Sequence, residues 1–119
     1  MSEDFDQVAT SVLFENGRVR VWEMTLAPGQ ASDWHTHLHD YVFVNLTPAK
    51  ISLKMSDREP ISRRLDDGFA QYVAVGPDGE AQHQLINAGD TPLRQILIEL
   101  LGPSEASESS EPENNGRFL

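Results

Sequence analysis

The sequence contains no cysteine among its 119 residues. This absence excludes disulfide bonds, thiolate metal ligands and cysteine nucleophiles, and it is compatible with a reducing compartment. A chain without cysteine that binds a transition metal must use imidazole and carboxylate ligands instead.

Long hydrophobic runs and basic residues are also scarce. The longest apolar run, residues 96–101, has only the length of a strand and is interrupted by Glu99. The first residues, Met1–Asp4, lack the basic and then apolar pattern of a secretion signal. Nine Lys and Arg against 19 Asp and Glu give a net charge of −10, which disfavours a nucleic acid or an anionic membrane as partner. We therefore predict a cytoplasmic protein that binds neither nucleic acid nor membrane.

Short apolar stretches separated by turn signals fill most of the chain. Ile51–Met55 alternates apolar and polar residues as a half-buried strand does, and Gly76–Gly79 is a strong loop signal. No stretch has the periodicity of a long helix. This pattern predicts one all-β sandwich or barrel domain over residues 12–102. A helical or irregular lead-in over residues 1–11 and an acidic, disordered tail over residues 103–119 would flank it.

Three of the four histidines alternate along one stretch, as His35, His37 and His39, and Tyr41 follows in the same phase. A strand through this stretch and the apolar run after it would place all four side chains on one face. Residues two apart on a strand are about 6.6 Å apart, close enough for two imidazoles to share one ion. Spacing alone leaves two pairs open, His35 with His37 or His37 with His39. A third histidine ligand would have to be His83, brought over by the fold.

Two stretches resemble the paired motifs of the cupin superfamily, whose members are small jelly-roll β-barrels with a metal in the barrel mouth. The first motif is a glycine, five intervening residues and His-x-His, and the second combines Gly, Pro-x-Gly and a histidine four positions before an asparagine. The matching residues are Gly29, His35-Thr36-His37, Gly68, Pro77-Asp78-Gly79, His83 and Asn87. The resemblance covers roughly residues 12–101 and implies a cupin-type double-stranded β-helix. The Asp-Tyr-Val that follows the histidines resembles a subgroup of small single-domain cupins that includes one associated with β-alanine degradation.

The resemblance implies that His35, His37 and His83 are the metal ligands. One departure is the position of the family's glutamate ligand, which holds Tyr41 here. Asp40 lies one residue too early, and strand alternation would turn it away from the metal. Three neutral ligands leave open coordination positions and the full charge of the ion, a combination that favours an anionic or chelating substrate.

Cupins with three-histidine sites include iron enzymes that add dioxygen to thiols or diketones. The resemblance therefore implies one divalent transition metal ion, with Fe(II) as first choice and zinc, nickel or manganese as alternatives. We predict a dioxygenase-type enzyme that acts on a small anionic or dicarbonyl metabolite. A non-oxidative isomerase or lyase that uses the metal as a Lewis acid, and a non-catalytic ligand-binding or sensing cupin, remain open. We also expect a homodimer, because small barrels commonly cover their exposed edge strands by pairing.

Four further side chains are candidates for the pocket. Tyr41 is a candidate catalytic residue that would supply a proton or a hydrogen bond, or it is a core aromatic residue. His39 and Tyr72 are candidates for the pocket lining, although Tyr72 also fits a packed strand tyrosine. Arg63, with its neighbour Arg64, is interpreted as part of a solvated edge, although an arginine near the mouth would suit an anionic substrate.

Overall fold

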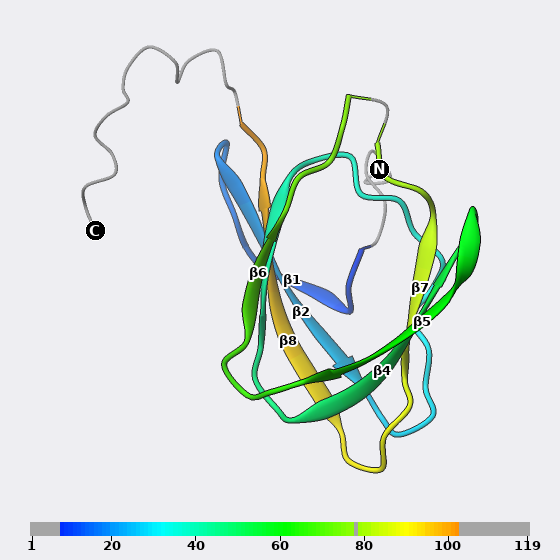
Figure 1. Cartoon of the computed structure of the whole chain (residues 1–119). Coiled ribbons are helices and arrows are strands. Elements are labelled where there is room, and N and C mark those ends of the chain that lie inside the picture. The colour runs from blue at the N-terminus through cyan, green and yellow to red at the C-terminus, as the bar shows by residue number, and fades with distance from the viewer. Residues whose placement is uncertain (1–7, 78, 103–119) are drawn as a thin grey trace.

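The computed structural model describes residues 8–77 and 79–102 of the chain. These residues form eight β-strands and no helix (Figure 1). The strands are β1 (Ser11–Glu15), β2 (Val19–Leu26), β3 (Tyr41–Asn45), β4 (Ala49–Met55), β5 (Arg58–Leu65), β6 (Ala70–Val73), β7 (His83–Asn87) and β8 (Leu93–Leu100). The all-β prediction is therefore confirmed. None of the described residues belongs to a helix long and apolar enough to cross a membrane.

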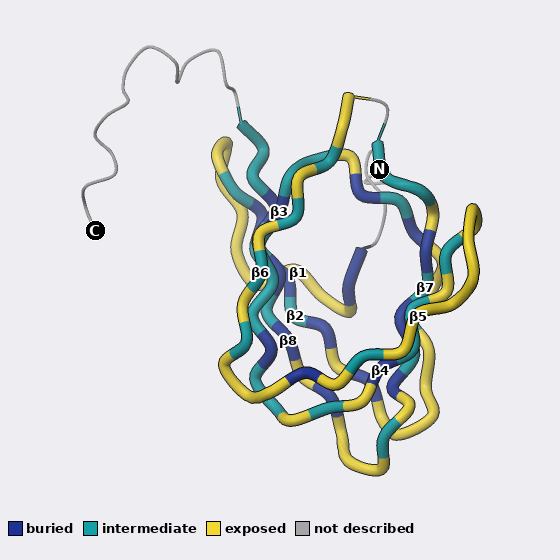
Figure 2. Tube along the Cα trace, viewed as in Figure 1, coloured by how far each residue is buried: buried dark blue, intermediate teal, exposed yellow. Residues whose placement is uncertain are grey.

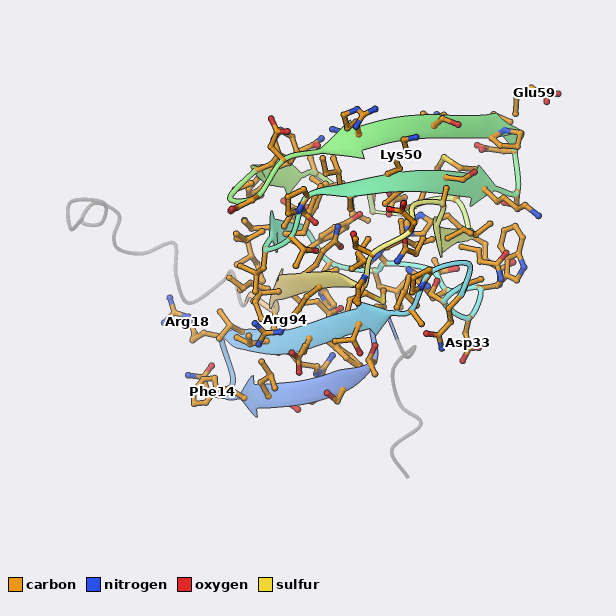
Figure 3. All side chains as sticks on the ribbon, turned by 90° about the horizontal axis from the view of Figure 1, so that it is seen from below. Phe14, Arg18, Asp33, Lys50, Glu59 and Arg94 are labelled. Carbon is orange, nitrogen blue, oxygen red and sulfur yellow. The ribbon has the colours of Figure 1, made fainter. Side chains whose placement is uncertain are left out.

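The strands form two antiparallel sheets that face each other. One sheet has the strand order β1-β2-β8-β3-β6, and the other has the order β5-β4-β7. Strands adjacent in space are often distant in the chain, as in a jelly roll, so the barrel joins residues that no local pattern connects. Side chains of both sheets project into the space between them, while the labelled Phe14 and Glu59 lie at the periphery (Figure 3).

The core lies between the sheets and follows the alternation of the long strands. Trp22, Met24 and Leu26 of β2 are buried on one face, and β8 contributes Leu93 and Leu97 from the neighbouring strand. Buried stretches follow β2, β7 and β8, whereas β1 is exposed along its length (Figure 2). Burial of this apolar face at roughly 25 cal/mol per Å² is the main force that holds the two sheets together.

Asn87 fixes the end of β7 that lies opposite His83. Its fully buried side chain donates to the carbonyl oxygens of Leu26 and Thr91, at 3.0 and 2.8 Å, and accepts from the amide of Gly89 at 3.0 Å. Both amide N–H donors and the carbonyl oxygen are thus bonded to backbone groups of the end of β2 and of the loop after β7. Asn87 therefore stabilises the turn that follows β7.

The predicted strand through the histidines is wrong. Regular pairing of β3 begins only at Tyr41, and the described segment before it makes just two isolated bridges, Ala31 with Ile86 and His35 with His83. The reason is that β7 begins only at His83, so the segment beside the later histidines is a loop and not a strand. An alternating residue pattern forms a strand only where a neighbouring strand accepts and donates the backbone hydrogen bonds, and here that neighbour is missing.

Residues 8 and 9 of the predicted lead-in pack into the core of the barrel. Val8 and Ala9 are buried in the core, and β1 already begins at Ser11. The described end of the lead-in, residues 8–10, contains no helix. The remainder of the predicted lead-in and the predicted tail over residues 103–119 lie outside the described residues.

Candidate metal centre

The backbone holds His35 and His83 directly opposite each other. Each amide donates to the other residue's carbonyl oxygen at 2.9 Å, which makes an antiparallel hydrogen-bonded pair. Residues opposite each other in such a pair direct their side chains to the same face. This bridge places His83 next to His35, although the two residues are far apart in the sequence.

A close contact between two loops positions His37. The amide of Glu80 donates to the carbonyl oxygen of His37 at 3.1 Å. The preceding residue, Gly79, has φ of +87°, and a Cβ atom there would lie 3.1 Å from the side chain of Leu38 and 3.4 Å from the oxygen of His37. A side chain at this position would therefore be strained by its backbone and crowded by its neighbours. The glycine of the Pro-x-Gly motif allows the loop before β7 to pack against the histidine segment.

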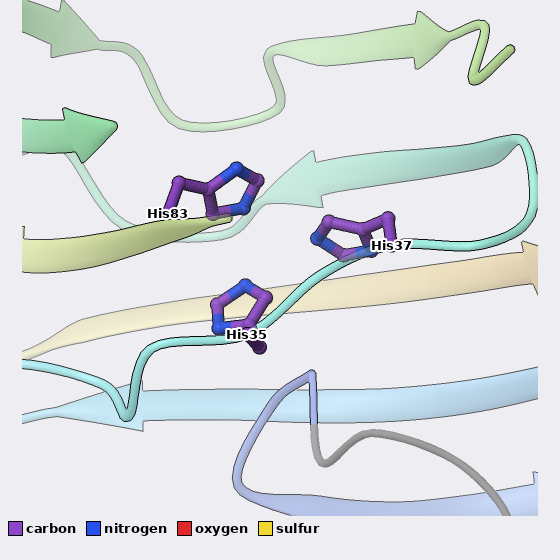
Figure 4. Close-up of side chains that lie close together, drawn as sticks. All are labelled: His35, His37 and His83. Carbon is purple, nitrogen blue, oxygen red and sulfur yellow. The ribbon is translucent and has the colours of Figure 1, made fainter. Parts of the chain in front are cut away.

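The three imidazoles converge on one point, as Figure 4 shows. Ring centroids lie 5.0 Å apart for His35 and His37, 4.6 Å for His35 and His83, and 5.0 Å for His37 and His83. One potential ligand nitrogen from each ring lies within 4.8 Å of the others, and all three residues are buried. The site that the sequence predicts from these three residues is thus assembled by the fold.

The hydrogen bonds of the rings fit a metal ion. His35 donates from Nδ1 to the carbonyl oxygen of Asp33 at 2.8 Å, because a carbonyl can only accept, and its Nε2 is left with a lone pair. The Nδ1 atoms of His37 and His83 are buried and have no hydrogen-bond partner among the described residues. Buried polar atoms without partners are costly, and a bound cation would satisfy such lone pairs.

Burial keeps the rings in the form that binds metals. It lowers the pKa of His37 to about 2, with further lowering from His35 and His83. The pKa of His83 falls to about 4, mainly through burial and then through His35. Both imidazoles are therefore neutral at neutral pH, and no proton has to leave before an ion binds.

Tyr41 packs against the histidine cluster rather than opening onto solvent. Its ring stacks on that of His37 at 4.0 Å between centroids with an interplanar angle of 22°, and its hydroxyl lies 3.5 Å from Oε1 of Glu80. Burial, followed by the negative charge of Glu80, raises the pKa of the Tyr41 hydroxyl. Tyr41 therefore remains a protonated hydrogen-bond donor at the edge of the site.

Glu80 is the functional candidate that sequence reasoning missed. Its Oε1 lies 3.8 Å from Nδ1 of His83, so a carboxylate does stand beside the histidines although position 41 cannot supply one. Burial raises the pKa of this carboxyl group, while the Tyr41 hydroxyl and, more weakly, Arg58 act in the opposite direction. The available signal was its position directly after the Pro-x-Gly motif and three residues before His83.

A cavity of about 200 Å³ lies between the sheets beside the histidine cluster. This volume suits a small metabolite, since pockets for drug-sized ligands usually measure roughly 300–1,000 Å³. The three histidines, Tyr41 and Glu80 share the lining with apolar side chains that include Met24, Phe43, Ile51, Leu53, Val73 and Leu97. A larger hollow of about 460 Å³ is lined by residues of β4, β5 and the adjoining turns, and none of the histidines lines it.

Two predicted lining residues lie elsewhere. His39 is half-buried but outside both the cluster and the cavity lining, because the segment leaves the histidine face before it reaches this residue. Tyr72 is 56% exposed and donates a hydrogen bond to Asp40 on the outside of the barrel. Asp40 also accepts from the amide of Val75 at 2.8 Å, and the expectation that Asp40 faces away from the metal site is confirmed.

Arg63 also differs from the sequence-based interpretation. It lines the cavity, whereas the adjacent Arg64 is exposed. Alternation along β5 explains the difference, because Arg63 shares the inward face with the buried Leu65. The interpretation of both arginines as a solvated edge therefore holds only for Arg64.

Comparison with solved structures places this architecture among the cupins. A cupin domain from Bordetella pertussis Tohama I is similar over 76% of this chain and 88% of its own, with 29% identity and a TM-score of 0.67. An RmlC-like cupin family protein with a double-stranded β-helix fold from Methanocaldococcus jannaschii is similar over 89% and 97%, with 15% identity and a TM-score of 0.60. A protein with a double-stranded β-helix domain from Klebsiella pneumoniae is similar over 87% of this chain and 83% of its own, with 19% identity and a TM-score of 0.60.

The fold is the cupin-type double-stranded β-helix, and the site is a cluster of three histidines positioned to bind a metal ion. No family model matches the sequence, and no curated protein matches it either. The structural neighbours support the cupin superfamily, while the closer resemblance to the β-alanine-associated subgroup stays a prediction.

Proposed function

We propose that this chain is a metal-dependent cupin enzyme in which His35, His37 and His83 hold one divalent ion, preferably Fe(II), and the adjacent cavity receives a small anionic or dicarbonyl substrate. The observation that carries this proposal is the placement of three buried imidazoles, of which His37 and His83 are held neutral, on the wall of a largely apolar cavity. A structural metal site needs no such space, because its coordination is closed by protein ligands.

The chemistry that Fe(II) supplies, when bound, is redox reactivity toward dioxygen, and that of zinc, nickel or manganese is polarisation of a substrate oxygen. The residues of the chain supply the rest. The apolar walls exclude water from the substrate and strengthen electrostatic interactions at the histidine end. The Tyr41 hydroxyl donates its single proton to Glu80 in this structure, and on substrate binding it can turn that proton to a substrate oxygen beside His37.

Oxygen consumption tests the oxidative function. The Fe(II)-loaded protein should consume dioxygen when a small thiol, diketone or keto acid substrate is present, in proportion to product formed. The measurement is an oxygen-electrode screen with product detection by NMR, and the same screen with His83→Ala serves as the matched control. Turnover without oxygen uptake would contradict the dioxygenase and support an isomerase or lyase. Ligand binding without turnover would support a sensing module.

Glu80 gives the non-oxidative alternative a specific basis. An isomerase or lyase needs a group that moves a proton at the substrate, and Glu80 places a half-buried carboxylate on the cavity wall next to the Tyr41 hydroxyl. In this role it would take a proton from a substrate carbon or hydroxyl group and return it to a neighbouring atom.

Replacing Glu80 with glutamine tests that role. Glutamine keeps the size of the side chain but cannot accept the proton, so turnover of a proton-transfer reaction should fall by about 10²–10⁴-fold. Metal content should stay near one ion per chain, which separates the catalytic effect from loss of the site. Glu59→Gln, on the exposed part of β5, is the control and should change neither quantity. Unchanged kcat in Glu80→Gln would exclude Glu80 as the proton-transfer group.

A further inference from the structure

Arg63 stands at a different part of the cavity wall from the metal cluster. It lies on β5 and pairs with Ile51 on β4, whereas His83 pairs with Met55 four residues further along β4. At about 3.3 Å per residue, the two pairs are about 13 Å apart along the strand. Both side chains nevertheless line the same cavity. The cavity therefore has histidines toward one end and an arginine toward the other.

The surroundings of Arg63 hold its guanidinium in place without neutralising it. Its Nη1 donates to Oε1 of Gln71 at 3.3 Å, and its Cζ lies 5.4 Å from the centroid of the Phe69 ring. No ion pair joins Arg63 to a carboxylate in the part of the chain that the structure describes. A guanidinium has five N–H donors, and the hydrogen bond to Gln71 uses one of them.

Arg63 is also the only lysine or arginine among the described residues that line this cavity. In a chain with a net charge of −10, a positive group turned toward a largely apolar space is unusual. Partial burial of an unpaired charge is unfavourable, and a bound oxyanion would offset that cost. Arginine is well suited to this task because its planar fork matches a carboxylate with two parallel hydrogen bonds.

We propose that Arg63 is the anion-binding residue of the substrate site and that it binds the carboxylate of a short aliphatic acid. The opposite end of that acid carries the group directed at the histidines, and its hydrocarbon middle packs against the apolar walls. Gln71 and Phe69 act as positioning residues that orient the guanidinium. This inference rests on the proposed function for the identity of the far end, but the carboxylate contact itself needs no metal.

The test measures binding of butyrate, with butyramide as its neutral isostere, by titration calorimetry and by the NMR signal of the Arg63 Nε–H group. The full-length protein is used as purified, and again after removal of metal by a chelator. Butyrate should shift the Arg63 signal and bind at least tenfold more tightly than butyramide in both preparations. Arg63→Met should weaken butyrate binding by about tenfold or more, since hydrogen bonds to charged groups are the strong ones.

Controls separate this contact from a structural role. Arg64→Met removes the neighbouring exposed arginine and should leave butyrate affinity unchanged. Arg63→Lys keeps a positive charge but loses the planar fork, and it should bind butyrate with intermediate affinity while its thermal unfolding stays that of the original protein. Equal affinities of butyrate for the original protein and Arg63→Met, or equal losses in Arg63→Met and Arg64→Met, would overturn the proposal. If the protein binds butyrate through Arg63 but holds no metal, that result would contradict the proposed metal function and leave the Arg63 proposal standing.

Discussion

Replacing His83 with alanine should reduce bound metal from about one ion per chain to an undetectable amount while the barrel remains folded. The His83 side chain supplies one of three converging nitrogens, and two imidazoles alone hold a divalent ion far more weakly than three. The fold should survive because the bridge to His35 uses backbone atoms only. Elemental analysis after purification and after reconstitution with Fe(II) measures the loss, and circular dichroism checks the fold.

His39→Ala is the matched control for this experiment. It removes an imidazole from the same segment, but His39 lies outside the cluster, so the variant should keep its metal. Retention of a full complement by His83→Ala would show that the third ligand is assigned wrongly. Loss of metal from both variants would mean that His39 contributes in a way that the arrangement of the three rings does not explain.

The metal-free protein should lose stability as the pH falls from 7 to 5. The pKa values of His37 and His83 are lowered to about 2 and about 4, from 6.5 for an unperturbed histidine. Between these values the unfolded chain binds protons that the folded chain does not, so the free energy of unfolding rises with pH in this window. The contribution of these two neutral rings to the free energy of unfolding is fully present above about pH 6.5. By pH 5 the free energy of unfolding should have fallen by an amount on the order of 3 kcal/mol.

Urea unfolding of chelator-treated protein at pH 7 and pH 5 measures this difference. The variant His83→Ala should show roughly half the loss, because only the buried ring of His37 still resists protonation. The raised pKa of Glu80 works in the opposite direction, since the folded protein then holds that proton more firmly than the unfolded chain does. Equal free energies of unfolding at the two pH values would contradict the assignment of buried, neutral histidines.

Local pattern was sufficient for the strands and for part of the site. Alternation over Ile51–Met55 predicts a strand that the structure contains as β4. Motif spacing and the resemblance to cupins implied which histidines converge, including His83. These features were predictable because strand periodicity and turn chemistry act over a few residues, and those residues are adjacent in the sequence.

Local pattern failed where the relevant contact crosses between distant segments. The histidine stretch alternates like a strand, yet His37 contacts the loop before β7 through Glu80 instead of a neighbouring strand. The same contact brings the Glu80 carboxylate to within 3.8 Å of His83. Periodicity carries no information on which loop packs against which, because that depends on how the two sheets close over the core.

The sequence by itself determined that this chain is an all-β protein without thiol chemistry, and that any transition metal it binds must be held by histidine or carboxylate side chains. Only the tertiary structure decided that Tyr41 packs on a ligand ring, that Glu80 stands beside the histidines, and that Arg63 turns inward. The physical reason is the range of the interactions. Residue chemistry and alternation are local, whereas burial, the separation between charges and the shape of the cavity arise only when both sheets enclose a common interior.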